Sequence, residues 1–357
     1  MWCSIIKHMK TIIRKVEEKQ LNNDVIEKAG KILKDGGLVA FPTETVYGLG
    51  ADALNEKAAQ KIYAAKGRPS DNPLIIHITN MEALKRIVSD IPEAACRAAK
   101  KYWPGPLTMI FHKSSIVPYG TTGGLDTVAV RMPSHEVACA VIDAGGGYIA
   151  APSANTSGRP SPTRAEHVEE DLNGRIDMIV DGGPVEIGVE STILDVSVTP
   201  PMILRPGAIT REMLCELLGD VAVDEALFEE DSKKAPKAPG MKYRHYAPKA
   251  KLCVVDGTVD MVVKEINRIS SEKIRQGIRV GIIGTEETVG HYAQGNVKCI
   301  GTRQDEATVA NRLYSVLREF DGENVDYILS ESFSGCGIGN AVMNRLLKAS
   351  GHDIIHV

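Results

Sequence analysis

From residue 9 to residue 220, short apolar runs alternate with segments of helical spacing. The runs predict strands, first in the segment that opens at Met9 and then at 38–41, 74–78, 107–111, 127–132, 148–151, 178–181 and 191–196. The spaced apolar positions predict helices at 23–34, 56–65, 81–87 and 93–102. Few of the strands are joined by tight two-residue turns, so the pattern favours an α/β fold in which helices cover a twisted mixed sheet.

A second alternation of this kind begins at Leu252. It predicts strands at 252–256, 279–285, 297–302 and 326–331, and helices at 259–274, 306–320 and 338–349. These elements form a small Rossmann-like layer of roughly 100 residues, which is the size of a domain. The glycines of this layer do not form the GxGxxG motif of dinucleotide-binding sites.

The segment between the two alternations differs from both in composition. Residues 229–251 combine several prolines with many charges and have no periodic apolar face, so they predict an extended linker. We therefore divide the chain into a domain at 9–220, a linker at 221–250 and a domain at 251–357, and we expect residues 1–8 to be an extension without a role. The stretch MKYRHY (241–246) places cations beside aromatic rings. It is either a solvated tether or a segment that folds over a ligand and stacks on a base.

Composition excludes several classes of site. The formal net charge of −4 gives no global basic field for nucleic acid, although a local basic patch is compatible with it. The seven cysteines are scattered without a CxxC pair, which is typical of a cytoplasmic protein with reduced thiols. No apolar run approaches the ~20 residues of a membrane helix. The sequence also lacks a P-loop and the HExxH, GxSxG and zinc-ligand patterns.

Short polar patches at strand ends are the candidate chemistry, because α/β proteins bind ligands in such loops. PTETVYG (42–48) supplies hydroxyls and backbone N–H groups. KGRPSDNP (66–73) supplies a lysine and an arginine suited to phosphate oxygens, and its prolines reduce the entropy lost on binding. Ordinary turn chemistry and a solvated charged loop are the alternatives for these two patches.

Four further features lie at or near strand ends. By alternation His77 shares a sheet face with Ile75, and a histidine packed in the core is the alternative to a functional one. Arg131 ends an apolar strand, where an unpaired cation is costly, so we expect a carboxylate partner from a ligand or from the protein. Arg205 ends another strand in the same way. APSANTSG (151–158) carries small hydroxyls and amides that suit close approach to phosphates or ribose.

These patches, taken in order, resemble the YrdC-like family of threonylcarbamoyl-AMP synthases. The resemblance is carried by FPTETVYGLG, KGRPSDNPL, WPGPLT, VAVRMPSH, APSANTSG, ESTILD and ILRPGAI, over about residues 20–215. The linker sequence PGMKYRHYAP and residues 250–357 resemble the longer, two-domain branch of that family. The implied fold is a YrdC-like twisted mixed sheet with helices, joined by an extended linker to a small Rossmann-like α/β domain.

The resemblance implies a nucleotidyltransferase reaction. L-Threonine, bicarbonate or CO2, and ATP would give L-threonylcarbamoyladenylate and pyrophosphate, with Mg²⁺ accompanying the ATP. The product would feed threonylcarbamoyladenosine formation in tRNA, through a separate threonylcarbamoyl transferase. The family further implies a cytoplasmic location without membrane contact, and weak binding of tRNA or double-stranded RNA is compatible with it.

The resemblance also assigns residues, position by position. Lys66 and Arg68 are expected beside the phosphates as catalytic residues, and no protein metal ligand is expected. The expected L-threonine pocket consists of Thr45, His77, Arg131, Ala151 and Ser191. The expected ATP contacts are Arg68, Asn72, Thr127, Ser153, Ser161, Arg205 and, from the linker, His245 or a neighbour.

Three other functions compete with this one. A YrdC-like fold with a basic concave surface could bind RNA without catalysis. Carbamoyl transfer in metal-centre maturation uses a related domain, but this sequence lacks the zinc-finger-like and acylphosphatase-like segments of those proteins. A purely structural protein would leave several strand-end cations without purpose. The role of residues 252–357 stays open between gating the pocket, recruiting the transferase and setting the oligomeric state.

Overall fold

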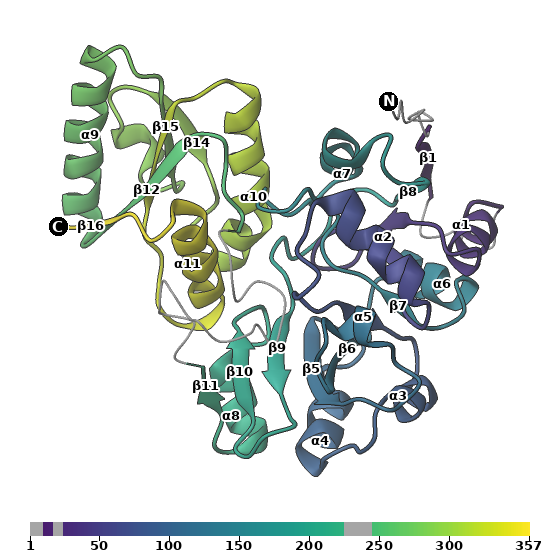
Figure 1. The fold of residues 1–357 in the computed structure, drawn as a ribbon. Helices are drawn as coiled ribbons and strands as arrows, with labels where there is room; N and C mark the ends of the chain where they lie inside the picture. The colour runs from purple at the N-terminus through teal and green to yellow at the C-terminus, as the bar shows by residue number, and fades with distance from the viewer. Residues whose placement is uncertain (1–9, 17–23, 225–244) are drawn as a thin grey trace.

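The two alternations of the sequence fold into two α/β layers that lie side by side (Figure 1). The structure is a computed structural model, and it describes residues 10–16, 24–224 and 245–357. The predicted extension at 1–8 and most of the predicted linker therefore lie outside the described residues. Among the described residues, no helix is both long enough and apolar enough to cross a lipid bilayer.

The first layer is built on an eleven-stranded mixed sheet. Its order is β1-β8-β2-β3-β7-β4-β6-β5-β9-β10-β11. The strands are β1 (Ile12–Lys15), β2 (Val39–Phe41), β3 (Gly48–Asp52), β4 (Ile75–His77), β5 (Leu107–His112), β6 (Thr127–Arg131), β7 (Ile149–Ala150), β8 (Met178–Asp181), β9 (Thr192–Asp195), β10 (Met202–Arg205) and β11 (Ala222–Val223). The sheet thus extends past the predicted domain boundary at residue 220.

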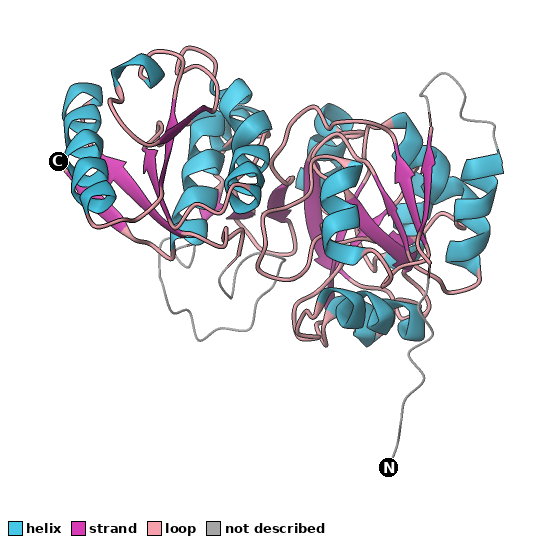
Figure 2. Ribbon diagram, turned by 90° about the horizontal axis from the view of Figure 1, so that it is seen from above, coloured by secondary structure: helices cyan, strands magenta, loops and turns pink. Residues whose placement is uncertain are grey.

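Helices cover the first sheet on both faces (Figure 2). They are α1 (Asp24–Lys34), α2 (Glu56–Lys66), α3 (Met81–Ile87), α4 (Glu93–Tyr102), α5 (Tyr119–Thr122), α6 (Glu136–Ala144), α7 (Ala165–Leu172) and α8 (Arg211–Leu218). Helices α1 and α6 pack together on β2 and β8, in a core that includes Leu33, Phe41 and Val141. Helices α2, α4, α7 and α8 contribute to a larger core on the opposite face.

The second layer is a parallel sheet of five strands. Its order is β14-β13-β15-β12-β16, and each pair in it is parallel. The strands are β12 (Lys251–Asp256), β13 (Val280–Gly284), β14 (Asn296–Cys299), β15 (Tyr327–Glu331) and β16 (Ile354–His356); the helices are α9 (Val259–Arg275), η3 (Val289–His291), α10 (Glu306–Gly322) and α11 (Gly337–Ser350). Helix α9 lies on the outer side, whereas α10 and α11 lie on the side of the first domain (Figure 1). The predicted fold class is confirmed.

Most predicted elements form within a residue or two of the expected ends, but β3 is a strand that the periodicity did not predict. Its sequence, GLGAD, has glycine at two of five positions, so it shows no alternation of side chains. Gly50 is needed because a Cβ there would lie 2.7 Å from the ring of Phe41. The helices α5 to α8 were likewise not predicted, and each is short.

Helix α10 docks closely on the first domain. A Cβ at Gly188 would lie 2.4 Å from the Cα of Asn311, and Gly188 has a φ of 86° that also favours glycine. The Asn311 amide donates to the carbonyls of Val185 and Glu186, at 3.1 and 2.7 Å. Val46 and Val189 of the first domain join the apolar core of the second. The two domains therefore share packed surface as well as a linker.

Candidate functional site

A pocket with about 660 Å³ of empty space, part of it open to solvent, lies where the first sheet meets the end of the linker. Its lining comes from segments far apart in the sequence: Thr43, Thr45, Val46, Gly48, Lys66, Arg68, Ile75, His77, Arg131, Ala151, Pro152, Ser153, Asn155, Ser157, Gly158, Glu190, Ser191, Arg205, His245 and Tyr246. Four of these residues are lysines or arginines, and most of the lining is buried. Such a site suits a polar, anionic ligand.

The turn between β2 and β3 is fixed by its own hydroxyls. The Thr43 hydroxyl accepts from the backbone N–H groups of Thr45 and Val46, at 3.2 and 3.3 Å, and lies 2.7 Å from the carbonyl of Val46. Threonine commonly closes turns in this way. The turn leaves the hydroxyls of Thr43 and Thr45 2.9 Å apart at the pocket.

Arg131 ends β6 in a buried ion pair. Its Nη2 lies 2.7 Å from Oε1 of Glu44, and both side chains are at most 5% exposed. Its Nη1 donates to the Thr45 hydroxyl at 2.9 Å. Burial raises the pKa of Glu44, but the charge of Arg131 outweighs it and the net shift is downward. The carboxylate that the sequence required for Arg131 is thus supplied by the protein.

His77 lies beside Arg131 because β4 and β6 are parallel and pair these two residues in register. Its Nδ1 is 3.1 Å from the carbonyl of Ile75. Burial, and then the charge of Arg131, lower the pKa of His77 to about 3. The ring is therefore neutral near pH 7. A neutral imidazole can donate or accept a hydrogen bond with a ligand without adding charge to the pocket.

Lys66 is the last residue of α2, and Arg68 follows two positions later. Gly67 caps this helix with a φ of 63°, and a lysine in the last turn suits the helix dipole. The Lys66 ammonium donates to the carbonyls of Ser153 and Asn155. Burial, and then Arg68, hold the pKa of Lys66 well below its usual range, and burial lowers that of Arg68 to about 10. The negative charge of a bound phosphate would favour the charged forms of both side chains and so raise both pKa values.

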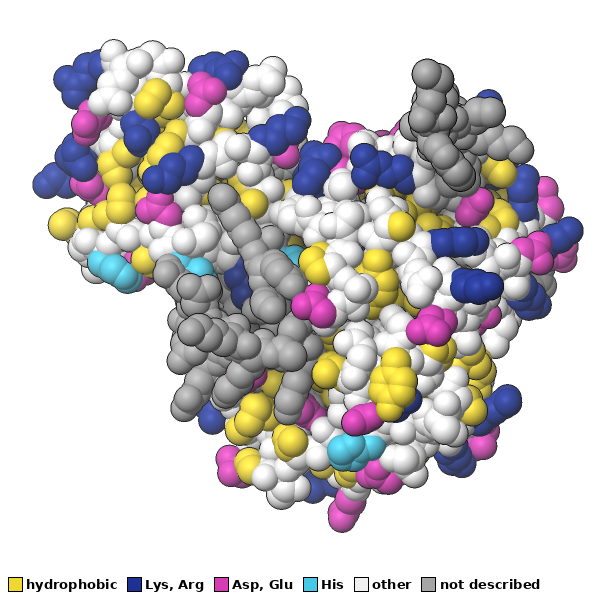
Figure 3. Space-filling view, in the orientation of Figure 1, with side chains coloured by type: hydrophobic (Ala, Val, Ile, Leu, Met, Phe, Trp, Pro, Cys, Tyr) yellow, Lys and Arg dark blue, Asp and Glu magenta, His cyan; other side chains and the backbone are white. Residues whose placement is uncertain are grey.

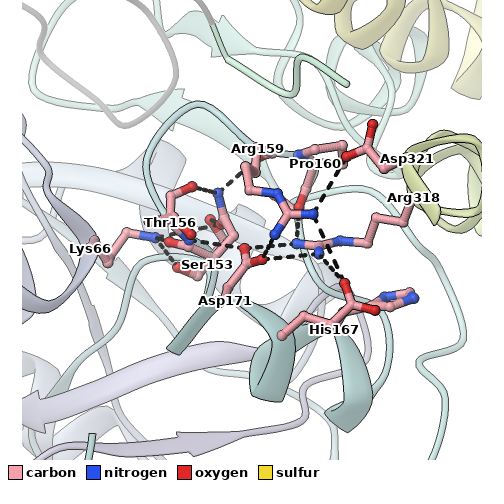
Figure 4. Close-up of polar contacts among 12 residues, drawn as sticks. Lys66, Ser153, Thr156, Arg159, Pro160, His167, Asp171, Arg318 and Asp321 are labelled. Atoms are coloured by element: carbon pink, nitrogen blue, oxygen red, sulfur yellow. Dashed lines mark hydrogen bonds and ion pairs between the residues drawn. The ribbon is translucent and has the colours of Figure 1, made fainter. Parts of the chain in front are cut away.

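The loop that receives Lys66 is tied to both domains (Figure 4). Asp171 of α7 accepts from the backbone N–H of Thr156 at 3.0 Å and pairs with Arg159. Asp171 also pairs with Arg318 of α10 at 3.0 Å, and Arg318 donates to the carbonyl of Pro160 at 2.6 Å. One carboxylate thus connects the loop around Ser153 to the second domain.

Ser191 and Arg205 meet where β9 and β10 pair. Arg205 donates through Nε to the Ser191 carbonyl at 3.0 Å and through Nη2 to the Ser191 hydroxyl at 3.2 Å. Ser191 also lies 2.7 Å from the hydroxyl of Thr108 on β5. Burial lowers the pKa of Arg205. The neighbouring Glu190 reaches across to the second domain.

The end of the linker closes one side of the pocket. Tyr246 is buried, has a φ of 65°, and its ring centroid lies 5.3 Å from that of Tyr314 and 5.6 Å from that of His245. The next residue, Ala247, donates its backbone N–H to the carbonyl of Gly158 at 2.8 Å. Two rings of the linker therefore line the same space as Arg68 and Arg205.

Comparison with known proteins identifies the family of the chain. A threonylcarbamoyl-AMP synthase of Pyrococcus abyssi is 49% identical over 97% of this chain and 100% of its own length. The chain belongs to the threonylcarbamoyl-AMP synthase family. The synthase of Bacillus subtilis is 47% identical over 98% of the chain and its own full length. The solved structure of P. abyssi Sua5 complexed with L-threonine has a TM-score of 0.91 and 46% identity, and the match covers 97% of this chain and 100% of that one.

Two family models together match most of the chain. The model that covers Sua5, YciO and YrdC proteins, described as telomere recombination, matches residues 31–207. The model for the C-terminal domain of threonylcarbamoyl-AMP synthase matches residues 209–351. The resemblance drawn from the sequence motifs is thus confirmed.

The structure brings most of the residues assigned from the synthase family into one pocket. Its lining includes Thr45, Lys66, Arg68, His77, Arg131, Ala151, Ser153, Ser191, Arg205 and His245. By alternation His77 does lie on the face of Ile75, which also lines the pocket. The roles of these residues toward threonine and ATP stay predictions.

Three assigned residues do not line the pocket. Asn72 is buried, and its backbone carbonyl oxygen lies 3.4 Å from Nη2 of Arg68. The Ser161 hydroxyl donates to the carboxylate of Glu190, which does line the pocket. Thr127 begins β6, so it stands four residues, or roughly 13 Å, from Arg131 at the other end of that strand.

Other lining residues were not assigned from the synthase motifs. Asn155 and Glu190 stand inside or beside quoted motifs, so their position was a usable signal. Tyr246 lies next to His245 in the aromatic stretch of the linker. Arg345 of the second domain contacts Glu190. The sequence indicated this residue only weakly, as a cation on the apolar face of a predicted helix.

Proposed function

We propose that the chain condenses L-threonine, bicarbonate or CO2, and ATP to L-threonylcarbamoyladenylate and pyrophosphate. The observation that carries this proposal is the convergence of Lys66, Arg68, Arg131 and Arg205 on one buried pocket. Burying four cations is costly unless anions compensate them, and a triphosphate together with an amino-acid carboxylate would do so. Relatives that match the whole chain carry the name of this synthase.

The threonine end of the pocket would be the one formed by Thr45, His77, Arg131, Ala151 and Ser191. Arg131 is held by Glu44 and can still direct a guanidinium edge at a carboxylate. Ala151, which is 4% exposed, offers only its backbone and methyl group. The similar P. abyssi protein has been solved in complex with L-threonine, which supports a threonine site in this chain.

The ATP end would be formed by Arg68, Ser153, Arg205 and His245, with Lys66 beneath them. Arg68, Arg205 and Tyr246 all line this pocket. Guanidinium groups bind phosphate oxygens with two parallel hydrogen bonds. The rings of His245 and Tyr246 would stack on the adenine. The contacts of Asn72, Thr127 and Ser161 with ATP would be indirect, since none of these residues lines the pocket.

The chemistry needs no protein nucleophile. The threonine amine adds to the carbon of CO2 and loses a proton, which gives a carbamate. A carbamate oxygen then attacks the α-phosphorus of ATP, the bond to the bridging oxygen breaks, and pyrophosphate leaves with the electron pair. Lys66 and Arg68 would stabilise the charge that develops on the phosphates, and the rest of the pocket would orient the two reactants. This is nucleotidyl transfer to a carbamate.

Mg²⁺ would enter with ATP. Among the described residues, no group of three or more His, Cys, Asp or Glu side chains is placed to hold a metal ion. Glu190, the carboxylate that lines the pocket, is already paired with an arginine. Mg²⁺ needs few protein ligands when phosphates hold it, and it would neutralise phosphate charge there. A cytoplasmic location and a threonylcarbamoyl transferase that passes the product to tRNA complete the proposal.

One experiment tests the function. The protein is incubated with ATP, Mg²⁺ and bicarbonate, with one amino acid at a time, and pyrophosphate is measured. We expect release that depends on threonine, and roughly 10- to 200-fold less with serine, because one methyl group separates the two. Release that does not depend on an amino acid would contradict the proposal. So would RNA binding with a steep salt dependence and no release.

The surface gives the RNA-binding alternative little support. In the face of Figure 3, Lys and Arg side chains are interspersed with Asp and Glu instead of forming one basic patch. The net charge of −4 agrees with this. The four cations that line the pocket are too buried to contact a helix of RNA.

A further inference from the structure

Glu190 is an unexpected residue in a pocket proposed to hold a triphosphate. It precedes Ser191, is 6% exposed, and lines the pocket with Lys66, Arg68 and Arg205. Among the described residues that line the pocket it is the only carboxylate. A bare anion there would repel phosphate and would compete with it for the guanidinium of Arg205, whose charge acts on Glu190.

The partners of Glu190 come largely from the second domain. Nε of Arg345, on α11, lies 3.0 Å from Oε2 of Glu190, and Nη2 donates to the Glu190 carbonyl at 3.3 Å. The Tyr314 hydroxyl, on α10, donates to the carboxylate and lies 2.9 and 3.1 Å from its two oxygens. Ser161 of the first domain completes the set. Glu190 is therefore fully partnered without using Arg205.

Arg345 is itself held in place. It is 1% exposed, its Nη1 donates to the carbonyl of Pro206 at 2.7 Å, and its guanidinium lies 5.9 Å from the ring centre of Tyr246. Pro206 directly follows Arg205. The same guanidinium thus contacts the strand end that carries Arg205, the carboxylate of Glu190 and the ring that closes the pocket.

We propose that Arg345, assisted by Tyr314, is a positioning residue of the second domain that neutralises Glu190 and thereby prevents it from competing with the phosphates of ATP for Arg205 and Arg68. The proposal rests on the proposed function of the pocket. It gives the second domain a definite task, because Arg345 reaches Glu190 only when α11 is docked on the first domain.

The electrostatics of Glu190 agree with this arrangement. Burial raises the pKa of Glu190, but the charges of Arg345 and then Arg205 outweigh it, so the net shift is downward and the group stays ionised. Removal of Arg345 would leave Arg205 as the principal cation facing Glu190. A new Glu190–Arg205 pair would then hold the guanidinium that the phosphates need.

The test compares four variants of the full chain by ATP titration and by steady-state kinetics. We expect Arg345→Met to raise the Kd and KM for ATP at least tenfold and to change the KM for threonine less than threefold. We expect Tyr314→Phe to shift the ATP values in the same direction by a smaller factor. Asn311→Ala is the control, because the Asn311 side chain docks the same interface by donating to the carbonyls of Val185 and Glu186, neither of which lines the pocket, and we expect it to leave the Kd for ATP within threefold of the wild-type value.

The double variant Glu190→Gln/Arg345→Met separates charge from packing. It removes both charges, so we expect it to recover most of the ATP affinity that Arg345→Met loses. A Kd for ATP that stays at the wild-type value in Arg345→Met overturns the proposal. A double variant no better than Arg345→Met also overturns it, because Arg345 would then act only by holding the domains together.

Two further outcomes are distinguishable. If Arg345→Met does not fold, the double variant is compared directly with the wild type, and a tenfold loss of ATP affinity in it overturns the proposal. If the wild type binds ATP but releases no pyrophosphate with threonine, the proposed function fails, whereas the ATP titrations still decide the role of Arg345.

Discussion

The Glu44–Arg131 pair shows how one residue can serve both folding and ligand binding. We predict that Arg131→Met lowers the free energy of unfolding by ~3–5 kcal/mol, because it leaves a buried carboxylate without its cation. Both side chains are at most 5% exposed, so solvent gives little compensation. Urea denaturation followed by circular dichroism measures this loss.

The variant Glu44→Gln/Arg131→Met separates the two roles of Arg131. With neither charge present, most of the stability should return. Threonine binding, measured by calorimetry, should stay absent in both variants, because the guanidinium that would face the carboxylate is gone. Threonine binding by the double variant at wild-type affinity would remove Arg131 from the threonine site.

His77 gives the fold a dependence on pH. Its pKa is about 3 in the folded protein, against an ordinary value of 6.5, so between these values the unfolded chain binds more protons. The contribution of His77 to the free energy of unfolding should therefore be fully present above pH 6.5. It should fall as the pH drops toward 3, by up to about 1.4 kcal/mol per pH unit. His77→Gln should flatten the slope between pH 4 and 6, as measured by urea unfolding at each pH. His112→Gln removes an exposed histidine and should keep the wild-type slope.

At the scale of elements, α2 is the helix that delivers Lys66 and Arg68. It begins at the cap residue Asn55, whose Oδ1 accepts from the backbone N–H groups of Lys57 and Ala58 at 3.1 and 3.3 Å. We predict that Asn55→Ala costs about 0.5–2 kcal/mol of unfolding free energy in thermal or urea melts. Asn55→Asp keeps the acceptor and should retain most of the stability; equal losses in both variants would argue against the cap.

At the scale of the whole molecule, Gly188 controls how closely the domains approach. Gly188→Ala would force a Cβ into the backbone of α10, with contacts of 2.4–2.6 Å to Asn311 and Ala310. We expect α10 to lose protection in hydrogen–deuterium exchange and the KM for ATP to rise. The matched control is Gly183→Ala. Gly183 has a φ of 85°, close to the 86° of Gly188, and open space around it. A similar exchange pattern in both would show that backbone strain alone is responsible.

The sequence by itself determined which local elements form and which chemical groups stand at their ends. Periodicity predicted α2, β4 and β6, because side chains on one face of an element repeat at a fixed spacing. The motifs around Thr45, Arg68 and Arg205 predicted the pocket's contents because they lie within short loops. Glycine-rich β3 was missed because glycine carries no side chain to show a period.

Only the tertiary structure decided which of these groups meet. Glu44 as the partner of Arg131, and Arg345 as the partner of Glu190, depend on contacts across 87 and 155 positions of sequence. No local pattern encodes such distances, since they follow from strand order and from the docking of α10 and α11. The physical reason is that a buried charge takes its partner from whatever chain segment packing brings within hydrogen-bond reach.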